Sequence, residues 1–239
     1  MLENGGGDGL HPDFGHKSLL GVAARKKERA GDSVGTVDVS AMYQNIGRQW
    51  AHGYGHTVMW FNLPNPEDRP NYRQKERLEA AYGPERADCM VNLFKGMCIY
   101  PNFQFQDAMA TYFRIFRPLS VDRTEITFYC VAQTTDSPED SYHRLRQFEE
   151  FFMGSGMGTP DDNAEFEECH IGATGAEPGD NFISFGIHDR IVGQDDYADK
   201  WGMKIEHSGP IGYEGSTMTE YDEWLRLMSR KPAVRGVQG

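Results

Sequence analysis

The chain has 239 residues, which is enough to bury one sizeable hydrophobic core, and prolines and glycines are spread along it without a dividing linker. Its 24 basic and 36 acidic residues give a formal charge of −12, so its surface should repel nucleic-acid phosphates. The longest apolar stretches are far shorter than the about 18 residues of a membrane helix. The four cysteines form no C-x-x-C pair, so we expect a soluble cytoplasmic protein with reduced, mostly buried thiols.

Strand-like segments rich in aromatic and β-branched residues occupy the middle of the chain. They span residues 56–61, 97–105, 108–117 and 125–132. A short segment that begins with Pro118 separates the last two, so they should form a hairpin whose first strand ends at this proline, which lacks a ladder donor. The pattern predicts an antiparallel sheet.

Helix signals follow the strands. Ser137 supplies an N-cap hydroxyl and Pro138 fits the first helical position, which predicts an amphipathic helix to residue 152. Thr159 and Pro160 repeat this signal and open a second helix to about residue 169, and a third is expected over 219–229. The apolar stripes of the first and third helices are Tyr142, Leu145, Phe148 and Phe152, and Tyr221, Trp224, Leu225 and Met228. The predicted fold class is α+β.

Two histidines with an acidic neighbour lie near the start of the chain, in the string Asp8-x-x-His11-x-x-x-x-His16. On an ideal helix, residues five apart point about 140° away from each other, so the backbone must bend for both rings to bind one ion. Pro12 and Gly15 weaken a regular helix at this place. Taken alone, such a string is more often polar surface than a metal site.

A pair of carboxylates, Asp161 and Asp162, opens the second predicted helix. Helix capping and the helix dipole explain one acid, but not the pair together with the distant histidines. Two histidines and one carboxylate form the facial triad that leaves positions open on Fe(II). A structural zinc site would need four ligands, typically with thiolates, and no cysteine is placed for that. From the residues alone, polar surface, a mononuclear iron site and, more weakly, a zinc-dependent hydrolase with the same ligands all stay open.

These segments belong to a longer ordered pattern over roughly residues 1–170. It comprises residues 3–16 (ENGGGDGLHPDFGH), 55–57 (GHT), 65–70 (NPEDRP), 100–102 (YPN), 117–125 (RPLSVDRTE), 146–152 (RQFEEFF) and 155–162 (SGMGTPDD). The pattern resembles the catalytic domain of the large (alpha) subunit of Rieske non-haem iron aromatic-ring-hydroxylating dioxygenases. Its later part is particularly similar to the benzoate/toluate 1,2-dioxygenase branch.

The resemblance implies that His11, His16 and Asp162 bind a mononuclear Fe(II), with O₂ as co-substrate. Asp8 matches a bridging carboxylate that hydrogen-bonds a ligand histidine and links it to a Rieske-cluster histidine of the neighbouring subunit. Asn4 matches a further polar residue near the iron. The implied fold is a helix-grip (START/SRPBCC-like) catalytic domain, here a single domain over 1–239, and its substrate-binding residues are not identified.

The activity implied by the resemblance is cis-dihydroxylation of an aromatic carboxylate such as benzoate. Electrons would come from NADH through a reductase and a Rieske centre, and the implied partners are a beta subunit in an alpha-beta hetero-oligomer and that reductase. Neither nucleic acid nor a membrane is expected as a partner.

The sequence departs from the family pattern at Leu10 and Pro12, beside the first ligand. It also contains no C-x-H and C-x₂-H pair. A [2Fe-2S] Rieske domain is therefore expected to be absent from this chain, and the isolated chain is expected to be inactive. The alternative function is a catalytically silent helix-grip module that binds an apolar ligand.

Two further pairs of polar side chains have structural explanations. His52 and His56 have a metal-binding spacing, but the glycines between them argue against a helix. Arg114 and Arg117 could form a bidentate fork with a substrate carboxylate, but on a strand near the surface we expect them to form salt bridges.

Overall fold

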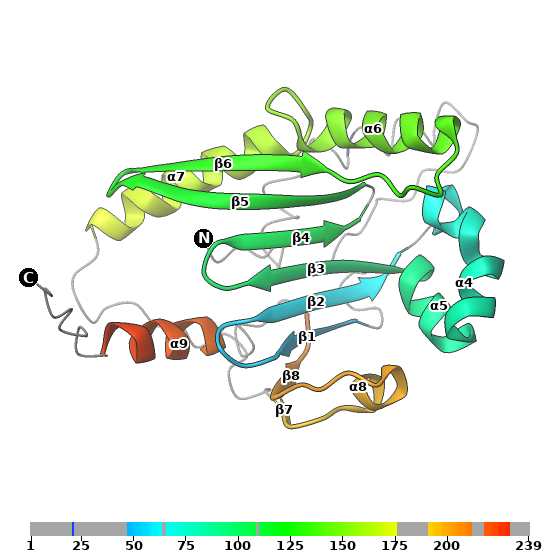
Figure 1. The fold of residues 1–239 in the computed structure, drawn as a ribbon. Helices are drawn as coiled ribbons and strands as arrows, with labels where there is room; N and C mark the ends of the chain where they lie inside the picture. Colours follow the sequence, from blue (N-terminus) through cyan, green and yellow to red (C-terminus); the bar gives the residue numbers. More distant parts are fainter. Residues whose placement is uncertain are drawn as a thin grey trace, which may run out of the picture.

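The computed structural model describes residue 21 and residues 47–63, 66–108, 110–175, 191–211 and 218–229. In these ranges eight strands form one antiparallel sheet in the order β6-β5-β4-β3-β2-β1-β8-β7 (Figure 1). The strands are β1 (Gly47–Ala51), β2 (Thr57–Asn62), β3 (Leu93–Ile99), β4 (Phe103–Asp107), β5 (Thr111–Ser120), β6 (Arg123–Cys130), β7 (Ile191–Val192) and β8 (His207–Gly209).

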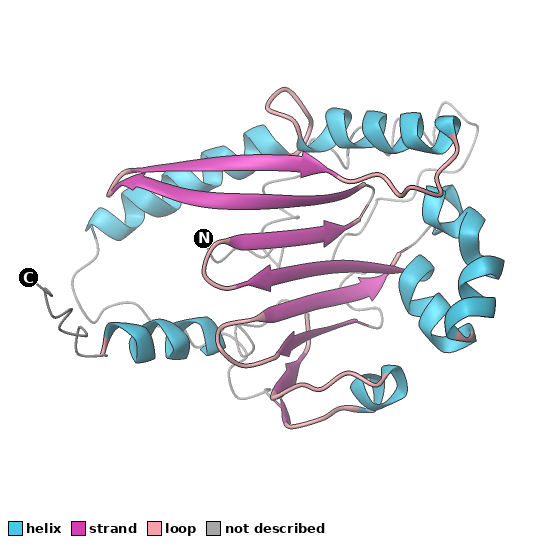
Figure 2. Ribbon diagram, viewed as in Figure 1, coloured by secondary structure: helices cyan, strands magenta, loops and turns pink. Residues whose placement is uncertain are grey.

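Helices surround this sheet, which confirms the α+β class (Figure 2). They are the 3₁₀ turns η1 (Pro66–Asp68) and η2 (Pro70–Gln74) and the helices α4 (Lys75–Tyr82), α5 (Pro84–Asn92), α6 (Pro138–Phe152), α7 (Thr159–Gly175), α8 (Asp196–Trp201) and α9 (Met218–Met228). Figure 1 shows α4 and α5 at one end of the strands and α9 at the other. No helix in the described ranges is long and apolar enough to cross a membrane.

The central strands bury both faces of the sheet, because successive side chains of a strand point to opposite sides. On the face that we call the α6 face, Met59 and Phe61 of β2 join a cluster with Tyr112 and the α6 residue Phe148. On the opposite face, which we call the α8 face, the cluster consists of Trp50, Val58, Trp60, Leu93, Ala198, Trp201 and Ile205. Each face therefore has its own core, and the two cores have different helical covers.

The predicted strand over 97–105 is wrong, because the structure divides it into β3 and β4. The turn lies at Tyr100-Pro101-Asn102, where the proline has no backbone N–H to donate. The hairpin of β5 and β6 is confirmed, but β5 continues past Pro118 to Ser120. The proline is tolerated because β4 starts at Phe103, which pairs with Ile115, so β4 does not reach Pro118. Pro118 therefore pairs only with β6, and the β4–β5 ladder loses no hydrogen-bond donor.

The three predicted helices exist as α6, α7 and α9, and α7 runs past residue 169 to Gly175. The N-cap of α6 is confirmed, since the Asp140 N–H donates to Ser137 Oγ at 3.0 Å. The predicted stripes are partly wrong. Tyr142 and Leu145 are exposed, and so are Trp224, Leu225 and Met228, whereas Glu220 and Glu223 are buried. Helical periodicity fixes which residues share a face, but not which face meets the sheet.

None of the four cysteines forms a disulfide bond in the described ranges. Cys98 is buried, Cys89 and Cys130 are half-buried, and Cys169 is exposed. The expectation of mostly buried thiols is therefore wrong for Cys169, which lies on the solvent side of α7.

Candidate metal centre and the sheet face beside it

Asp162 is the one predicted iron ligand that the structure describes, and it lies half-buried in the first turn of α7. His11 and His16 lie outside the described residues, as do Asp8 and Asn4. Within the described ranges, no group of three or more His, Cys, Asp or Glu side chains could hold a metal ion. A centre of the predicted composition would therefore take two of its three ligands from elsewhere in the chain.

A tight glycine turn places the start of α7 against the end of α6. The Gly158 N–H donates to Phe151 O at 3.0 Å, and Thr159 Oγ1 donates to Phe152 O at 2.7 Å. A Cβ atom on Gly158 would lie 2.5 Å from Cε1 of Phe151, so a side chain there would displace this buried ring. The Asp162 N–H then donates to Gly158 O at 3.0 Å and begins the helix.

Tyr112 of β5 lies close enough to Asp162 for the charge of that carboxylate to affect the pKa of the tyrosine. This tyrosine is 2% exposed and packs against Phe148 and Phe152 at ring-centroid distances of 5.9 and 4.2 Å. Burial raises the pKa of Tyr112, the charge of Arg114 opposes that rise, and the charge of Asp162 adds to it. The predicted ligand therefore lies near the buried middle of β5.

Four polar side chains line up across the α6 face, and we call them the polar row. The row is Thr57, Cys98, Gln104 and Arg114. Each is the direct cross-strand partner of the next, on β2, β3, β4 and β5, so consecutive members stand about 4.8 Å apart. Thr57 lies two residues before Met59 and Arg114 two after Tyr112, which places the row on the α6 face. All four are buried.

Glu220 of α9 closes the Thr57 end of the polar row. Thr57 Oγ1 donates to Glu220 Oε1 at 3.2 Å, and the carboxyl is 3% exposed. Burial raises the pKa of Glu220 to about 7, against the hydrogen bonds from Thr57 and Cys98. Burial, with a contribution from Glu220, raises the pKa of the Cys98 thiol to about 12. Sequence reasoning missed Glu220, because the run TEYDE is typical of an exposed helix face.

Arg114 forms the other end of the polar row. Its Nε–H donates to Gln104 Oε1, and its guanidinium carbon lies 5.3 and 5.8 Å from the ring centroids of Phe116 and Phe128. No ion pair joins Arg114 to a carboxylate of the described residues, so the salt bridge predicted for it is wrong. The reason is that its side of β5 faces the protein interior.

The salt bridge predicted for Arg117 is confirmed. Its Nε and Nη2 donate to the two carboxylate oxygens of Glu125, both at 2.9 Å, on the exposed end of the hairpin. The structural interpretation of His52 and His56 also holds. His52 Nδ1 contacts Lys204 O at 2.8 Å, and His56 Nδ1 accepts the Tyr100 N–H at 3.1 Å.

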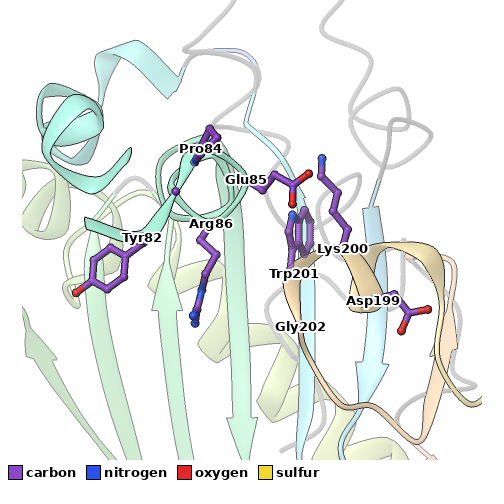
Figure 3. Close-up of a pocket in the computed structure, with 9 residues that line it drawn as sticks. Tyr82, Pro84, Glu85, Arg86, Asp199, Lys200, Trp201 and Gly202 are labelled. Atoms are coloured by element: carbon purple, nitrogen blue, oxygen red, sulfur yellow. The ribbon is translucent and has the colours of Figure 1, made fainter. Parts of the chain in front are cut away.

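A surface depression between the α4–α5 junction and α8 contains none of the predicted site residues (Figure 3). Its lining consists of Tyr82, Gly83, Pro84, Glu85, Arg86, Asp199, Lys200, Trp201 and Gly202. Trp201 belongs to the core of the α8 face, so this depression lies on the opposite side of the sheet from Tyr112. It is separate from the candidate metal centre.

Comparison with known proteins agrees with this fold. The chain is 40% identical over 244 residues to the 2-halobenzoate 1,2-dioxygenase large subunit of Burkholderia cepacia. It is 35% identical over 230 residues to the toluate 1,2-dioxygenase subunit alpha of Pseudomonas putida. These alignments cover 100% and 95% of this chain but 52% and 50% of the relatives, so the chain spans about half the length of the curated relatives it matches.

Among solved structures, naphthalene 1,2-dioxygenase from Rhodococcus sp. bound to indole matches with a TM-score of 0.77 at 16% identity. That match covers 97% of this chain and 53% of the other, and it shows a shared fold. The family model of the ring hydroxylating alpha subunit (catalytic domain) matches residues 4–203. The chain therefore belongs to the family of ring-hydroxylating alpha-subunit catalytic domains.

Proposed function

We propose that this chain is the catalytic part of a ring-hydroxylating dioxygenase alpha subunit that cis-dihydroxylates a benzoate-like aromatic carboxylate. The observation that carries the proposal is the family match over residues 4–203, which includes Asp162 at the start of α7. The relatives are named for 2-halobenzoate and toluate, and both are benzoate ions with one substituent on the ring.

The proposed iron ligands are His11, His16 and Asp162, with Asp8 and Asn4 beside them. Two imidazoles and one carboxylate fit Fe(II) and leave coordination positions open. The half-buried Asp162 lies in the first turn of α7, at the positive end of the helix dipole. Bound iron would supply the redox chemistry by which both atoms of O₂ enter the ring.

The described residues have a separate task in this proposal, which is to hold the ring in a dry environment. Phe148 and Phe152 pack on Tyr112 and exclude water from the sheet face beside Asp162. The electrons would come from NADH through a reductase and a [2Fe-2S] Rieske centre, in a cytoplasmic alpha-beta hetero-oligomer.

Iron analysis of the purified chain tests the metal part of the proposal. After anaerobic incubation with Fe(II) and desalting, we expect about one iron per chain for the wild type and a large loss for Asp162→Ala. Asp161→Ala is the matched control, because it removes the neighbouring acid of the same helical turn and should keep the iron. Equal iron in the wild type and Asp162→Ala would contradict the ligand assignment.

Turnover tests the activity. The chain is joined to a Rieske domain and supplied with a beta subunit, a reductase, NADH and benzoate, and we expect a cis-diol product. An iron-loaded chain that still gives no product would instead support the catalytically silent ligand-binding module.

A further inference from the structure

Three arginines are buried in the described part of the chain, and they differ in their counter-charges. Arg69 forms an ion pair with Asp107, and Arg144 forms one with Asp136 at 3.0 Å. Arg114 is 3% exposed and has no carboxylate partner among the described residues. Burying an unpaired charge is unfavourable, so a fold that keeps one has a use for it.

The surroundings of Arg114 hold its side chain still but leave donors available. Its one side-chain hydrogen bond within the described residues runs from Nε to Gln104 Oε1. The rings of Phe116 and Phe128 flank the guanidinium group. The planar fork of arginine carries further N–H donors on its two Nη atoms, in the geometry that a carboxylate accepts.

We propose that Arg114, oriented by Gln104, binds the carboxylate of the substrate. The inference rests on the proposed function, because it assumes that the substrate is an aromatic carboxylate. It adds a residue that recognises the charged group of that substrate.

The position of Arg114 relative to Asp162 fits this role. Phe152 packs on Tyr112 at 4.2 Å between ring centroids and accepts a hydrogen bond from Thr159 at the start of α7. Tyr112 lies two residues before Arg114 on the same face of β5. Two residues of a strand span about 7 Å, which is comparable to the length of a benzoate ion. A ring whose carboxylate contacts Arg114 can therefore extend along β5 toward the metal ligand.

The other end of the polar row also favours one orientation of the substrate carboxylate. Glu220 lies there, three strands away from Arg114, and it offers no positive charge to an anion in either protonation state. The cation at one end and the acid at the other favour a single placement of a carboxylate on this face. A neutral analogue of the same shape would lack this preference.

Ligand binding to the whole 239-residue chain tests the proposal. Calorimetric titration with benzoate and with neutral benzamide gives the ratio of the two affinities, and we expect the wild type to favour benzoate at least about tenfold. In Arg114→Met, which keeps the length of the side chain and removes the charge, the ratio should fall to about one.

Arg117→Met is the matched control. It removes an arginine from the same strand three residues further on, where the side chain is exposed and paired with Glu125. We expect it to keep the wild-type preference for benzoate. The inference is overturned if Arg114→Met keeps that preference, if Arg117→Met loses it as well, or if the wild type does not favour benzoate over benzamide.

A thermal measurement separates binding from folding. Benzoate should raise the unfolding midpoint of the wild type and of Arg117→Met, but not that of Arg114→Met, whose midpoint without ligand should not be lower than that of the wild type. Should Arg114→Met fail to fold, Arg114→Lys replaces it. Lysine lacks the planar fork, so the preference must shrink, and an unchanged ratio overturns the inference.

These readouts need neither iron nor turnover, so the two proposals can fail separately. In one outcome, the preference for benzoate depends on Arg114 but the chain forms no diol with its partners supplied. This outcome supports carboxylate binding by Arg114 and contradicts the proposed activity. In the other outcome, benzoate is oxidised but Arg114→Met leaves the affinity ratio unchanged. This outcome supports the proposed activity and overturns carboxylate binding by Arg114.

Discussion

Arg144 and Arg114 are almost equally buried, yet their neighbourhoods are opposite in kind. Around Arg144, Asp136 supplies a counter-charge at 3.0 Å, and Asn71 and Thr111 accept further hydrogen bonds. These contacts join α6, η2 and the start of β5 into one network. Arg114 has an amide and two aromatic rings around it. A buried charge with its counter-charge in place stabilises the fold, whereas Arg114, which has no counter-charge among the described residues, is the one we propose for a ligand.

Removing the counter-charge of Arg144 gives the largest expected effect. Asp136→Ala leaves a buried guanidinium unpaired, which should lower the free energy of unfolding by about 3–5 kcal/mol. Urea unfolding at neutral pH measures it. Glu167→Ala on the exposed side of α7 is the control and should change stability by about 0.5 kcal/mol or less. A loss below about 1 kcal/mol in Asp136→Ala would break the distinction between the two arginines.

Glu220 gives the next largest effect, through pH. Its folded-state pKa of about 7 lies above the ordinary value of 4.5, so the folded protein holds this proton more tightly than the unfolded chain. The contribution of Glu220 to the stability of the wild type should therefore fall as pH rises from about 4.5 to about 7, by an amount on the order of 3 kcal/mol.

The variant Glu220→Gln removes that titration and should flatten the pH dependence. The measurement is the free energy of unfolding at pH 5 and pH 8 for both proteins, so that all other titrating groups cancel in the difference. Glu167→Gln, on an exposed surface, should behave like the wild type. If Glu220→Gln shows the same slope as the wild type, the acid at the end of the polar row is not neutral in the folded state.

The exposed arginine of β5 gives the smallest effect. Arg117→Gln breaks the bidentate pair with Glu125, and we expect the unfolding midpoint to move by about 2 °C or less, because solvent screens an exposed pair. Differential scanning calorimetry measures this shift. If Arg117→Gln lowered the unfolding midpoint as much as Asp136→Ala does in the same calorimeter, burial would not explain the difference between the arginines.

The sequence alone predicts elements that carry their own local signals. Ser137-Pro138 and Thr159-Pro160 mark the starts of α6 and α7 with cap hydroxyls and prolines, and both helices begin there. The strand over 97–105 fails because aromatic residues continue across Pro101, so composition outweighs the turn signal. The assignment of Asp162 depends on the family pattern, since capping alone explains an acid at that place.

The roles of Arg114 and Arg117 could not be separated in the same way. Both belong to one strand with bulky side chains on each face, so alternation does not reveal which side is interior. The answer comes from the register of β5 with β4 and from α6, whose residues are far away in sequence. Glu220 is similar, because only the packing of α9 on β2 and β3 shows that it is buried.

The register of β5 against β4 decides which side chains of β5 face the interior, and with them the charge of the inner face. One residue added between Asp107 and Thr111, with the pairing of Thr111 onward shifted by one, would turn Arg114 away from the interior and bring an uncharged neighbour into its place. At the far end of β5, Val121 is 96% exposed, so a change of length there leaves the inner face as it is. A single residue in the first connection would then change the charge that the inner face presents, although the amino acids of β5 themselves stayed the same.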